Sequence, residues 1–158
     1  MRDSEIFALR GEAHHPWHLY AGVVLIDTEG KVALVKDPDG SYTLPRETMS
    51  TDEHFVMATH RLVLEQVQVV PHLIHYLGTL TRPYKRYDGA VTEKTVVYFQ
   101  ANFESAYHGR FGSDDTANGS RLWLAPEEAR KMLADQPNGE EVIIDRLTPT
   151  KKVVPSLT

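Results

Sequence analysis

The sequence has 158 residues, with 17 Lys and Arg against 22 Asp and Glu, and it contains no cysteine. A chain of this length buries enough surface for one domain, and its 41% hydrophobic and 25% charged residues exclude disorder, collagen and coiled coil for the whole chain. The lack of cysteine excludes disulfides, thiolate zinc sites, iron–sulfur clusters and a cysteine nucleophile. A formal net charge of −5 disfavours broad nucleic-acid binding and favours a phosphorylated small molecule or another protein as the partner.

The N-terminal segment, residues 1–17, is charged and interrupted by Pro16, unlike a signal or transit peptide. No run of the sequence approaches the roughly 18 apolar residues that a membrane-spanning helix needs. We therefore expect a cytoplasmic protein with no membrane partner. Its parts would be an N-terminal extension over 1–17, a domain over 18–147 and a C-terminal tail over 148–158.

The first predicted elements of the domain are two strands that a tight turn connects. Short β-branched runs at 20–26 and 31–35 flank residues 27–30, whose acidic side chains and glycine suit a hairpin. A second turn is predicted at 37–40, and residues 41–45 lead out of it.

An amphipathic helix is predicted over 53–68. Ser50 and Glu53 have the spacing of a capping box, in which Ser50 is the N-cap and Glu53 reaches back to its backbone N–H. Apolar residues then recur at intervals of three and four, which is the pattern of a helix with one buried side. We expect Pro71 to end this helix.

The next predicted elements are strands. The runs at 73–80 and 95–103 are strand-like, and the second is rich in β-branched and aromatic residues. Between them we predict a loop over 81–91. The polar, glycine-rich segment 109–120 is predicted to be a mobile surface loop, and residues 121–124 a short strand.

Two helices are predicted near the C-terminus. Pro126 suits the first position of a helix, and Glu127 and Glu128 fall in its first turn, as the helix macrodipole favours. A second helical segment is predicted over 140–147. The order of all these elements indicates an α/β domain with a mixed or antiparallel sheet.

The same order of elements resembles the Nudix hydrolase family over roughly residues 18–147. The resemblance rests on the Leu-Pro pair at 44–45, an acid-bearing helix, a later Trp-containing strand and a Pro-Glu-Glu-Ala helix. The family's box, G-x5-E-x7-R-E-U-x-E-E-x-G-U with U aliphatic, aligns with residues 47–69. Five positions match: Glu53, Arg61, Val63, Glu65 and Val69. The resemblance implies a Nudix-type α/β/α sandwich with a mixed central β-sheet.

Four positions of the box depart from the family pattern. Glu47 and Gln68 replace its glycines, and Leu62 and Gln66 replace two of its acids. In the family, the positions of Leu62, Glu65 and Gln66 carry carboxylates that bind Mg²⁺ and activate a water for attack on a diphosphate. Because these positions are i, i+3 and i+4, we expect the three side chains to share one helix face that borders a cleft. By analogy with other electrostatic deletions, each lost contact costs about 2.7–4 kcal/mol of catalysis, so the resemblance implies weak or lost hydrolysis.

Two further acids could complete a metal site with Glu65. Glu47 stands where the family has a glycine whose carbonyl binds the metal, and Glu93 lies where many family members place another acid. The resemblance thus implies Glu65 and Glu93 as catalytic candidates, and Glu47, Glu65 and Glu93 as Mg²⁺ ligands. The alternative is that they are unrelated surface glutamates. Glu53 and Arg61 would have a structural role in the box, or would be only a cap and a solvated ion pair.

A basic and aromatic segment is the other candidate site. Three cations and two tyrosines fall within six residues, and these side chains suit phosphates and a nucleobase. The candidate phosphate- or base-binding residues are Arg82, Tyr84, Lys85, Arg86 and Tyr87. The alternative is a solvated basic loop. The run at 94–98 resembles the Lys-Thr-Val-x-Tyr strand of Nudix enzymes that cleave dinucleoside polyphosphates.

Three functions remain open from the sequence. The first is a Nudix-like protein that binds a nucleotide or another diphosphate-linked compound, with weak or lost pyrophosphohydrolase activity. The second is an active Mg²⁺-dependent hydrolase of nucleoside diphosphate or dinucleoside polyphosphate compounds, using Glu47, Glu65 and Glu93. The third is a non-catalytic interaction or regulatory domain, which could form a homodimer.

Overall fold

The structure, a computed structural model, describes residues 18–50, 53–85, 89–103, 121–136 and 139–147. The predicted extension at 1–17, the predicted loop at 109–120 and the predicted tail at 148–158 lie outside these ranges. In the described part of the chain, no helix is long and apolar enough to cross a membrane.

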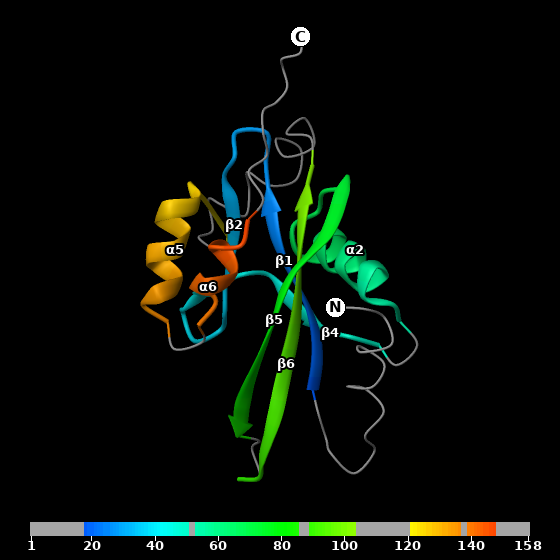
Figure 1. Cartoon of the computed structure of the whole chain (residues 1–158), viewed down its shortest axis with the longest axis vertical. Coiled ribbons are helices and arrows are strands. Elements are labelled where there is room, and N and C mark those ends of the chain that lie inside the picture. The colour runs from blue at the N-terminus through cyan, green and yellow to red at the C-terminus, as the bar shows by residue number, and fades with distance from the viewer. Residues whose placement is uncertain (1–17, 51–52, 86–88, 104–120, 137–138, 148–158) are drawn as a thin grey trace.

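A mixed sheet forms the centre of the molecule (Figure 1). Its strands are β1 (His18–Ile26), β2 (Val32–Lys36), β3 (Tyr42–Thr43), β4 (Arg46–Thr48), β5 (Leu73–Lys85), β6 (Val91–Asn102) and β7 (Arg121–Leu124). The described strands follow the order β3-β2-β1-β6-β5, with β4 paired to β1 and β7 paired to β2. β1 and β6 run parallel, and the other described pairs are antiparallel.

Helices cover both faces of this sheet. α2 (Phe55–Gln66) lies on one face, and α5 (Pro126–Ala134) and α6 (Glu141–Ile144) lie on the other (Figure 1). This arrangement confirms the predicted α/β/α sandwich with a mixed central sheet.

Strand alternation divides the core into two parts. Successive side chains of a strand point to opposite faces, so β1 supplies both helical layers. Val24 packs with Leu133 of α5, while its neighbour Val23 packs with Leu62 and Val63 of α2. β1 is therefore buried from both sides, which explains its nearly continuous apolar run.

The predicted hairpin after β1 is confirmed. Gly30 has a φ of 82°, and the Asp27 carboxylate accepts hydrogen bonds from the backbone N–H groups of Glu29 and Lys31, each at 2.9 Å. An aspartate that bonds its own turn backbone and a glycine in the left-handed region are the features that the sequence offers there.

The loop predicted at 81–91 is wrong over much of its length. β5 continues to Lys85 and pairs with β6 from Val91 onward, with Arg82 opposite Lys94. The cross-strand ladder outweighs the modest strand propensity of these polar residues. Pro83 is compatible with this arrangement because β5 is the edge strand of the sheet.

The predicted start of the long helix is also corrected. Glu53 Oε1 accepts the Ser50 N–H at 3.1 Å, as a capping box requires, but the helix begins at Phe55. Its N-cap is His54, whose Nδ1 accepts the Val56 N–H at 3.3 Å. Glu53 therefore precedes the helix instead of forming its first turn.

The same helix ends before Pro71. Its last helical residue is Gln66, its C-cap is Val67, and Gln68 follows with a φ of 65°. The left-handed residue redirects the chain three positions before the proline, so Pro71 is not what ends the helix. The helix predicted at 140–147 is shorter than expected, because α6 comprises only Glu141–Ile144.

Candidate functional site

Arg61, in the middle of α2, is the centre of a cluster of ion pairs. Its Nε and Nη2 donate to the two carboxylate oxygens of Glu53 at 2.7 and 2.8 Å, which is a bidentate pair. Its Nη1 donates to Glu47 Oε2 at 2.7 Å and to Glu65 Oε1 at 3.3 Å. Nη2 also reaches the carbonyl oxygen of Thr48 at 3.3 Å. One guanidinium thus connects β4, the segment before α2 and the last turn of α2.

The carboxylates around Arg61 differ in their affinity for protons. The hydrogen bonds from Arg61 lower the pKa of Glu53 to about 2. Burial raises the pKa of Glu47, and its hydrogen bond with the Glu65 carboxyl raises it further against the opposing effect of Arg61. Glu47 and Glu65 are neighbours in the structure, because both accept a hydrogen bond from Arg61 Nη1.

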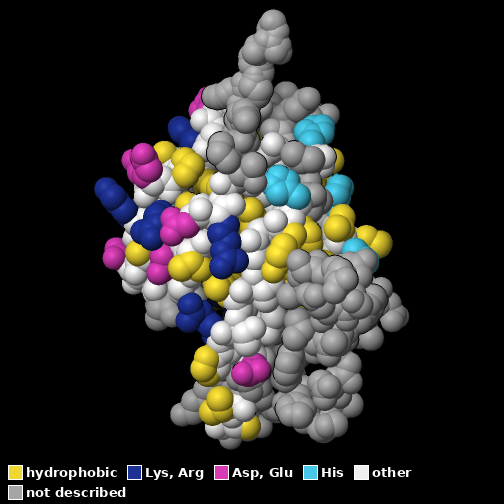
Figure 2. Space-filling view, in the orientation of Figure 1, with side chains coloured by type: hydrophobic (Ala, Val, Ile, Leu, Met, Phe, Trp, Pro, Cys, Tyr) yellow, Lys and Arg dark blue, Asp and Glu magenta, His cyan; other side chains and the backbone are white. Residues whose placement is uncertain are grey.

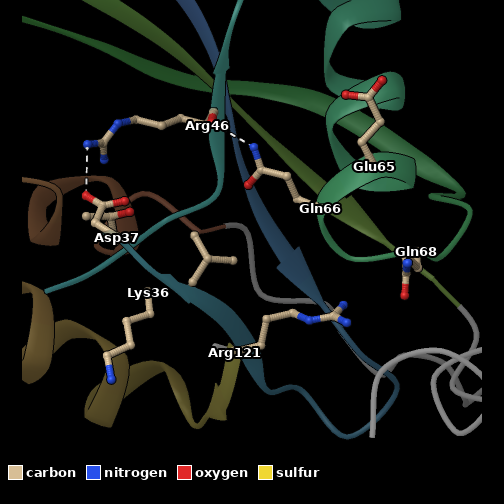
Figure 3. A pocket seen from close by; sticks show the side chains of 9 residues that line it. Lys36, Asp37, Arg46, Glu65, Gln66, Gln68 and Arg121 are labelled. Carbon is tan, nitrogen blue, oxygen red and sulfur yellow. Dashed lines mark hydrogen bonds and ion pairs between the residues drawn. The ribbon is translucent and has the colours of Figure 1, made fainter. Parts of the chain in front are cut away.

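A cavity of about 420 Å³ opens beside the C-terminal turn of α2 (Figure 3). Its charged and amide side chains are Lys36, Asp37, Arg46, Glu65, Gln66, Gln68 and Arg121. α2 and Gln68, two positions after its end, supply one side, and β2, β4 and β7 contribute to the facing side (Figure 3).

Gln66 and Arg46 connect the two sides of this cavity. The amide Nε2 of Gln66 donates to the Arg46 carbonyl at 3.0 Å, and its distance to Glu47 Oε1 is 3.5 Å. The Arg46 guanidinium lies 3.5 Å from Asp37 Oδ2 and 3.4 Å from Glu140 Oε2. An amide in place of an acid therefore fixes the backbone of β4 against the helix.

Arg121 is a buried cation at the edge of the cavity. Only 2% of its surface is exposed, and burial lowers the pKa of its guanidinium. Its Nη1 donates to the carbonyl of Val67, the C-cap of α2. A positive charge at this position complements the negative end of the helix macrodipole and satisfies a terminal carbonyl.

Two of the three expected helix positions face the cavity, whereas the prediction for Leu62 is wrong. Glu65 and Gln66 line it, whereas Leu62 is fully buried and packs with Ala21 and Val23 of β1. Leu62 lies on the core side of the shared face, where the sheet covers it. A carboxylate at this position would have to displace part of that packing to reach solvent.

Gln68 keeps the backbone conformation that a glycine favours. In the described part of the chain it is the non-glycine residue with a positive φ, at 65°. This region disfavours side chains with a Cβ, and the aligned Nudix box has its second glycine at this position. The alignment of the box with 47–69 therefore agrees with the local backbone, although the glycine itself is missing.

Glu93 does not join the Glu47–Glu65 pair. Ala21 of β1 pairs with both Glu47 and Val97, so Glu93 lies four residues further along β6, at roughly 3.3 Å per residue or about 13 Å. Its side chain is exposed. Among the described residues, no group of three or more His, Asp or Glu side chains is arranged to hold a metal ion.

The basic segment is divided by the strand that replaces the predicted loop. Arg82 lies on β5 and lines a second, smaller cavity on the α5–α6 face. Tyr84 and Lys85 belong to the last residues of β5, and Arg86 and Tyr87 lie outside the described residues.

Sequence reasoning missed Lys36, Arg46 and Arg121 as cavity residues. They are far apart in the sequence, and the pairings of β4 with β1 and of β7 with β2 bring them together. The one local signal is the start of the Arg-Leu-Trp-Leu run, where an arginine precedes three apolar residues. A cation that is buried at the start of a strand needs an acceptor, but the sequence does not tell which one.

Comparison with known proteins identifies the class to which this fold and site belong. The sequence matches the profile of the NUDIX domain over residues 16–147, so the chain belongs to the Nudix family. Among curated proteins, none matches the sequence.

Solved structures support the same fold. A MutT mutator protein from Bacillus halodurans has 16% identity and a TM-score of 0.59, over 81% of this chain and 80% of that one. The Ap4A hydrolase of C. elegans has 16% identity and a TM-score of 0.58, over 81% and 95% of the two chains. The NUDIX domain of Shewanella oneidensis NrtR, solved with ADP ribose, has 18% identity and a TM-score of 0.58, over 92% and 96%. At these identities the likeness concerns the fold alone.

Proposed function

We propose that this Nudix protein binds a nucleotide or another diphosphate-linked compound in the 420 Å³ cavity, with weak or lost pyrophosphohydrolase activity. The observation that carries the proposal is the composition of the cavity beside α2. Of the three helix positions that carry acids in the family box, only Glu65 carries one here, whereas Lys36, Arg46 and Arg121 lie across the cavity. The site is therefore better equipped to bind phosphates than to activate water.

The cations have distinct parts in this proposal. Lys36 is exposed at the end of β2 and can approach a phosphate directly. Arg46 is held by Asp37 and Glu140, so it presents a guanidinium whose position is already fixed. A fixed guanidinium binds an oxyanion with little loss of side-chain entropy.

The oxygen donors available to Mg²⁺ are few. Glu47 and Glu65 are neighbours around Arg61 Nη1, and Gln66, whose amide Nε2 lies 3.5 Å from Glu47 Oε1, carries a further neutral oxygen. Carboxylate and amide oxygens are the hard donors that Mg²⁺ prefers. Arg61 Nη1 already occupies one oxygen of each carboxylate. These residues would hold the ion together with the phosphates of a ligand, where it would neutralise phosphate charge.

A second function is favoured by the proximity of Glu47 and Glu65. In an active hydrolase, this pair would replace the missing helix acids, and Glu47, whose pKa burial raises, would be the better proton acceptor. The names of the similar structures, an Ap4A hydrolase and a domain solved with ADP ribose, suggest the compounds to test.

Thermal melting with ADP, ADP-ribose and diadenosine tetraphosphate, each with and without Mg²⁺, tests the proposal. A ligand at about 100 times its Kd adds roughly 2.7 kcal/mol of apparent stability, which is easily measured. We expect stabilisation by at least one compound, weakened by Lys36→Gln and not by Lys131→Gln on the exposed side of α5. Slow or absent hydrolysis of the compounds in the same samples supports a binder. Mg²⁺-dependent hydrolysis that Glu47→Gln abolishes supports the hydrolase. If no compound binds, the domain has another role.

A further inference from the structure

A second cavity, of about 50 Å³, lies between β5, β6 and the start of α6. Its charged side chains are Arg46, Arg82, Lys94 and Glu140. We infer that it is a subsite for a compact oxyanion, namely a phosphate monoester group or inorganic phosphate. The inference rests on the proposed function, because it adds a preference for ligands that carry a phosphate beyond the diphosphate.

The register of the sheet places two of the cations together. Arg82 on β5 pairs with Lys94 on β6, so both side chains emerge at the same level of the antiparallel ladder. Val96 and Tyr98 follow Lys94 on the same face and form the wall of the cavity. Lys94 Nζ also lies 4.7 Å from the centre of the Tyr20 ring on β1. The cations are thus positioned by paired strands, which are rigid elements of the fold.

Gly139 leaves room for the Arg82 guanidinium. A Cβ at residue 139 would lie 1.5 Å from Arg82 Nη2, and the φ of 76° is itself one that glycine favours. The guanidinium therefore packs against the backbone before α6. Arg82 Nε is buried and has no hydrogen-bond partner among the described residues. A buried N–H donor without an acceptor is costly, and Arg82 lines a cavity that could hold an acceptor.

The single carboxylate of the cavity already has its own partners. Glu140 accepts hydrogen bonds from the Leu44 N–H at 3.0 Å and from the Tyr98 hydroxyl, and it pairs with Arg46 at 3.4 Å. Three cations thus face one carboxylate whose oxygens are engaged. Burial lowers the pKa of Lys94 and the charge of Arg46 lowers it further, against the opposing charges of Asp37 and Glu140. An anion beside Lys94 and Arg82 would favour the charged form of Lys94.

The size of the cavity limits what it can accept. One water needs roughly 10–15 Å³ of such volume, so about 50 Å³ admits a group of a few oxygens and not a purine ring. Arg46 lines this cavity and the larger one, so the two are adjacent. A ligand with its diphosphate in the larger cavity could therefore place a terminal phosphate here.

Inorganic phosphate is the first probe. We would titrate it into the protein without Mg²⁺, at constant ionic strength, and follow the arginine Nε–H signals in ¹H–¹⁵N spectra. The signal that disappears in Arg82→Gln identifies Arg82. We expect this signal to shift and saturate with phosphate and not with chloride. Lys94→Gln should weaken binding by roughly tenfold or more, which corresponds to one charge-assisted hydrogen bond.

Lys131→Gln is the matched control, because it also removes one positive charge. It lies on α5, whose outer side carries exposed charges of both signs (Figure 2), and it should leave phosphate affinity unchanged. If Arg82→Gln unfolds the protein, Arg82→Lys keeps the charge without the Nε donor, and Lys94→Gln alone decides the outcome. An Arg82 signal that phosphate does not shift, or unchanged affinity in Lys94→Gln, would overturn the inference.

A second arm distinguishes the two sources of phosphate. Diphosphate compounds with and without a terminal phosphate monoester are compared on the wild type and on Lys94→Gln. A preference for the phosphorylated compound that Lys94→Gln removes assigns the subsite to the ligand, whereas phosphate binding without such a preference assigns it to free phosphate. If diphosphate compounds do not bind at all while phosphate still shifts Arg82, the proposed function fails and the anion subsite remains.

Discussion

Arg61 is the main partner that stabilises the charged form of Glu53. Its pKa is about 2 in the folded protein against an ordinary value of 4.5, so we expect Glu53→Gln to lower the free energy of unfolding at pH 7 by roughly 2–3 kcal/mol. Because the folded pKa is depressed, the loss should be fully present above pH 4.5 and should shrink as the pH falls towards 2. Urea unfolding of both proteins across this range measures it.

Glu29→Gln is the control for that prediction. The Glu29 side chain is 72% exposed and pairs with Lys31 at 3.7 Å, a geometry that contributes little. Its substitution should change stability by less than about 0.5 kcal/mol at every pH. A Glu53→Gln effect that is independent of pH would mean that the pKa of Glu53 is not depressed in the folded protein.

Gln68 stores backbone strain at the end of α2. With a φ of 65°, we expect Gln68→Gly to be more stable than Gln68→Ala by about 1 kcal/mol, because both lose the side chain but only alanine keeps the strain. Chemical denaturation of the two variants isolates this difference. Equal stability would show that the left-handed conformation costs nothing here.

Gln66 and Leu62 should respond differently to replacement by an acid. Gln66→Glu puts a second carboxylate beside Glu65 on the helix side of the cavity, so we expect at least roughly tenfold tighter Mg²⁺ binding and a stability loss of about 1–2 kcal/mol that Mg²⁺ reverses. Leu62→Glu buries a charge in the core and should cost roughly 3–5 kcal/mol, with little rescue by Mg²⁺. Calorimetric titration and thermal melting measure both effects.

Gln66→Met separates the two effects of the first substitution. It removes the hydrogen bond to the Arg46 carbonyl without adding charge. We expect a similar loss of stability and no response to Mg²⁺. A variant Gln66→Glu that behaves in the same way would contradict the idea that this helix face can still bind the ion.

At the scale of elements, the C-terminal end of α2 is stabilised by a cation that lies more than 50 residues later in the sequence. Arg121 of β7 donates to the carbonyl of Val67, the C-cap of α2. We expect Arg121→Met to destabilise the protein by about 2 kcal/mol or more, since it leaves a buried carbonyl without a donor. Arg130→Met, on the exposed side of α5, should cost less than about 0.5 kcal/mol. Denaturation curves of the two variants give the comparison.

The sequence predicts those elements whose own residues are apolar enough to indicate burial. β1, β2 and β7 have apolar runs with clear turns beside them, and all three are found where they were expected. The extension of β5 to Lys85 is not visible locally, because it depends on pairing with β6. A strand that is stabilised by its partner rather than by its own apolar residues resembles a loop in the sequence.

The site was predictable to the same extent. Helix spacing brings Glu65 and Gln66 to one face, and that prediction is confirmed. Spacing alone does not tell which edge of the face the sheet covers, so Leu62 was misplaced. Arg46 and Arg121 come from strands that pair over long sequence distances, which no local pattern encodes.

At the scale of the whole molecule, Glu140 connects three parts of the fold. It bonds Leu44 before β4, Tyr98 on β6 and Arg46, from its own position before α6. We expect Glu140→Ala to cost roughly 3–5 kcal/mol, because it leaves the buried Tyr98 hydroxyl and the Leu44 N–H without their acceptor and leaves Arg46 with Asp37 as its carboxylate partner. Glu128→Ala on exposed α5 is the control, and calorimetric melting is the measurement.

A smaller stability loss for Glu140→Ala would have a different meaning. If loss of Glu140 opened the small cavity to water, hydration would reduce the cost to about 1–2 kcal/mol. Such a result would mean that Glu140 orients the neighbouring cations more than it stabilises the fold.

The parallel pairing of β1 with β6 also affects the order in which the chain folds. His18 pairs with Lys94, 76 positions later, whereas the β1–β2 and β5–β6 hairpins close over short loops. Closing a long loop costs more chain entropy than closing a short one, so the two hairpins have the lower barrier to formation. The docking of one hairpin against the other is then the late step in folding. Until it happens, the inner edges of β1 and β6 are unpaired, and this is the stage at which the nascent chain is most exposed to aggregation.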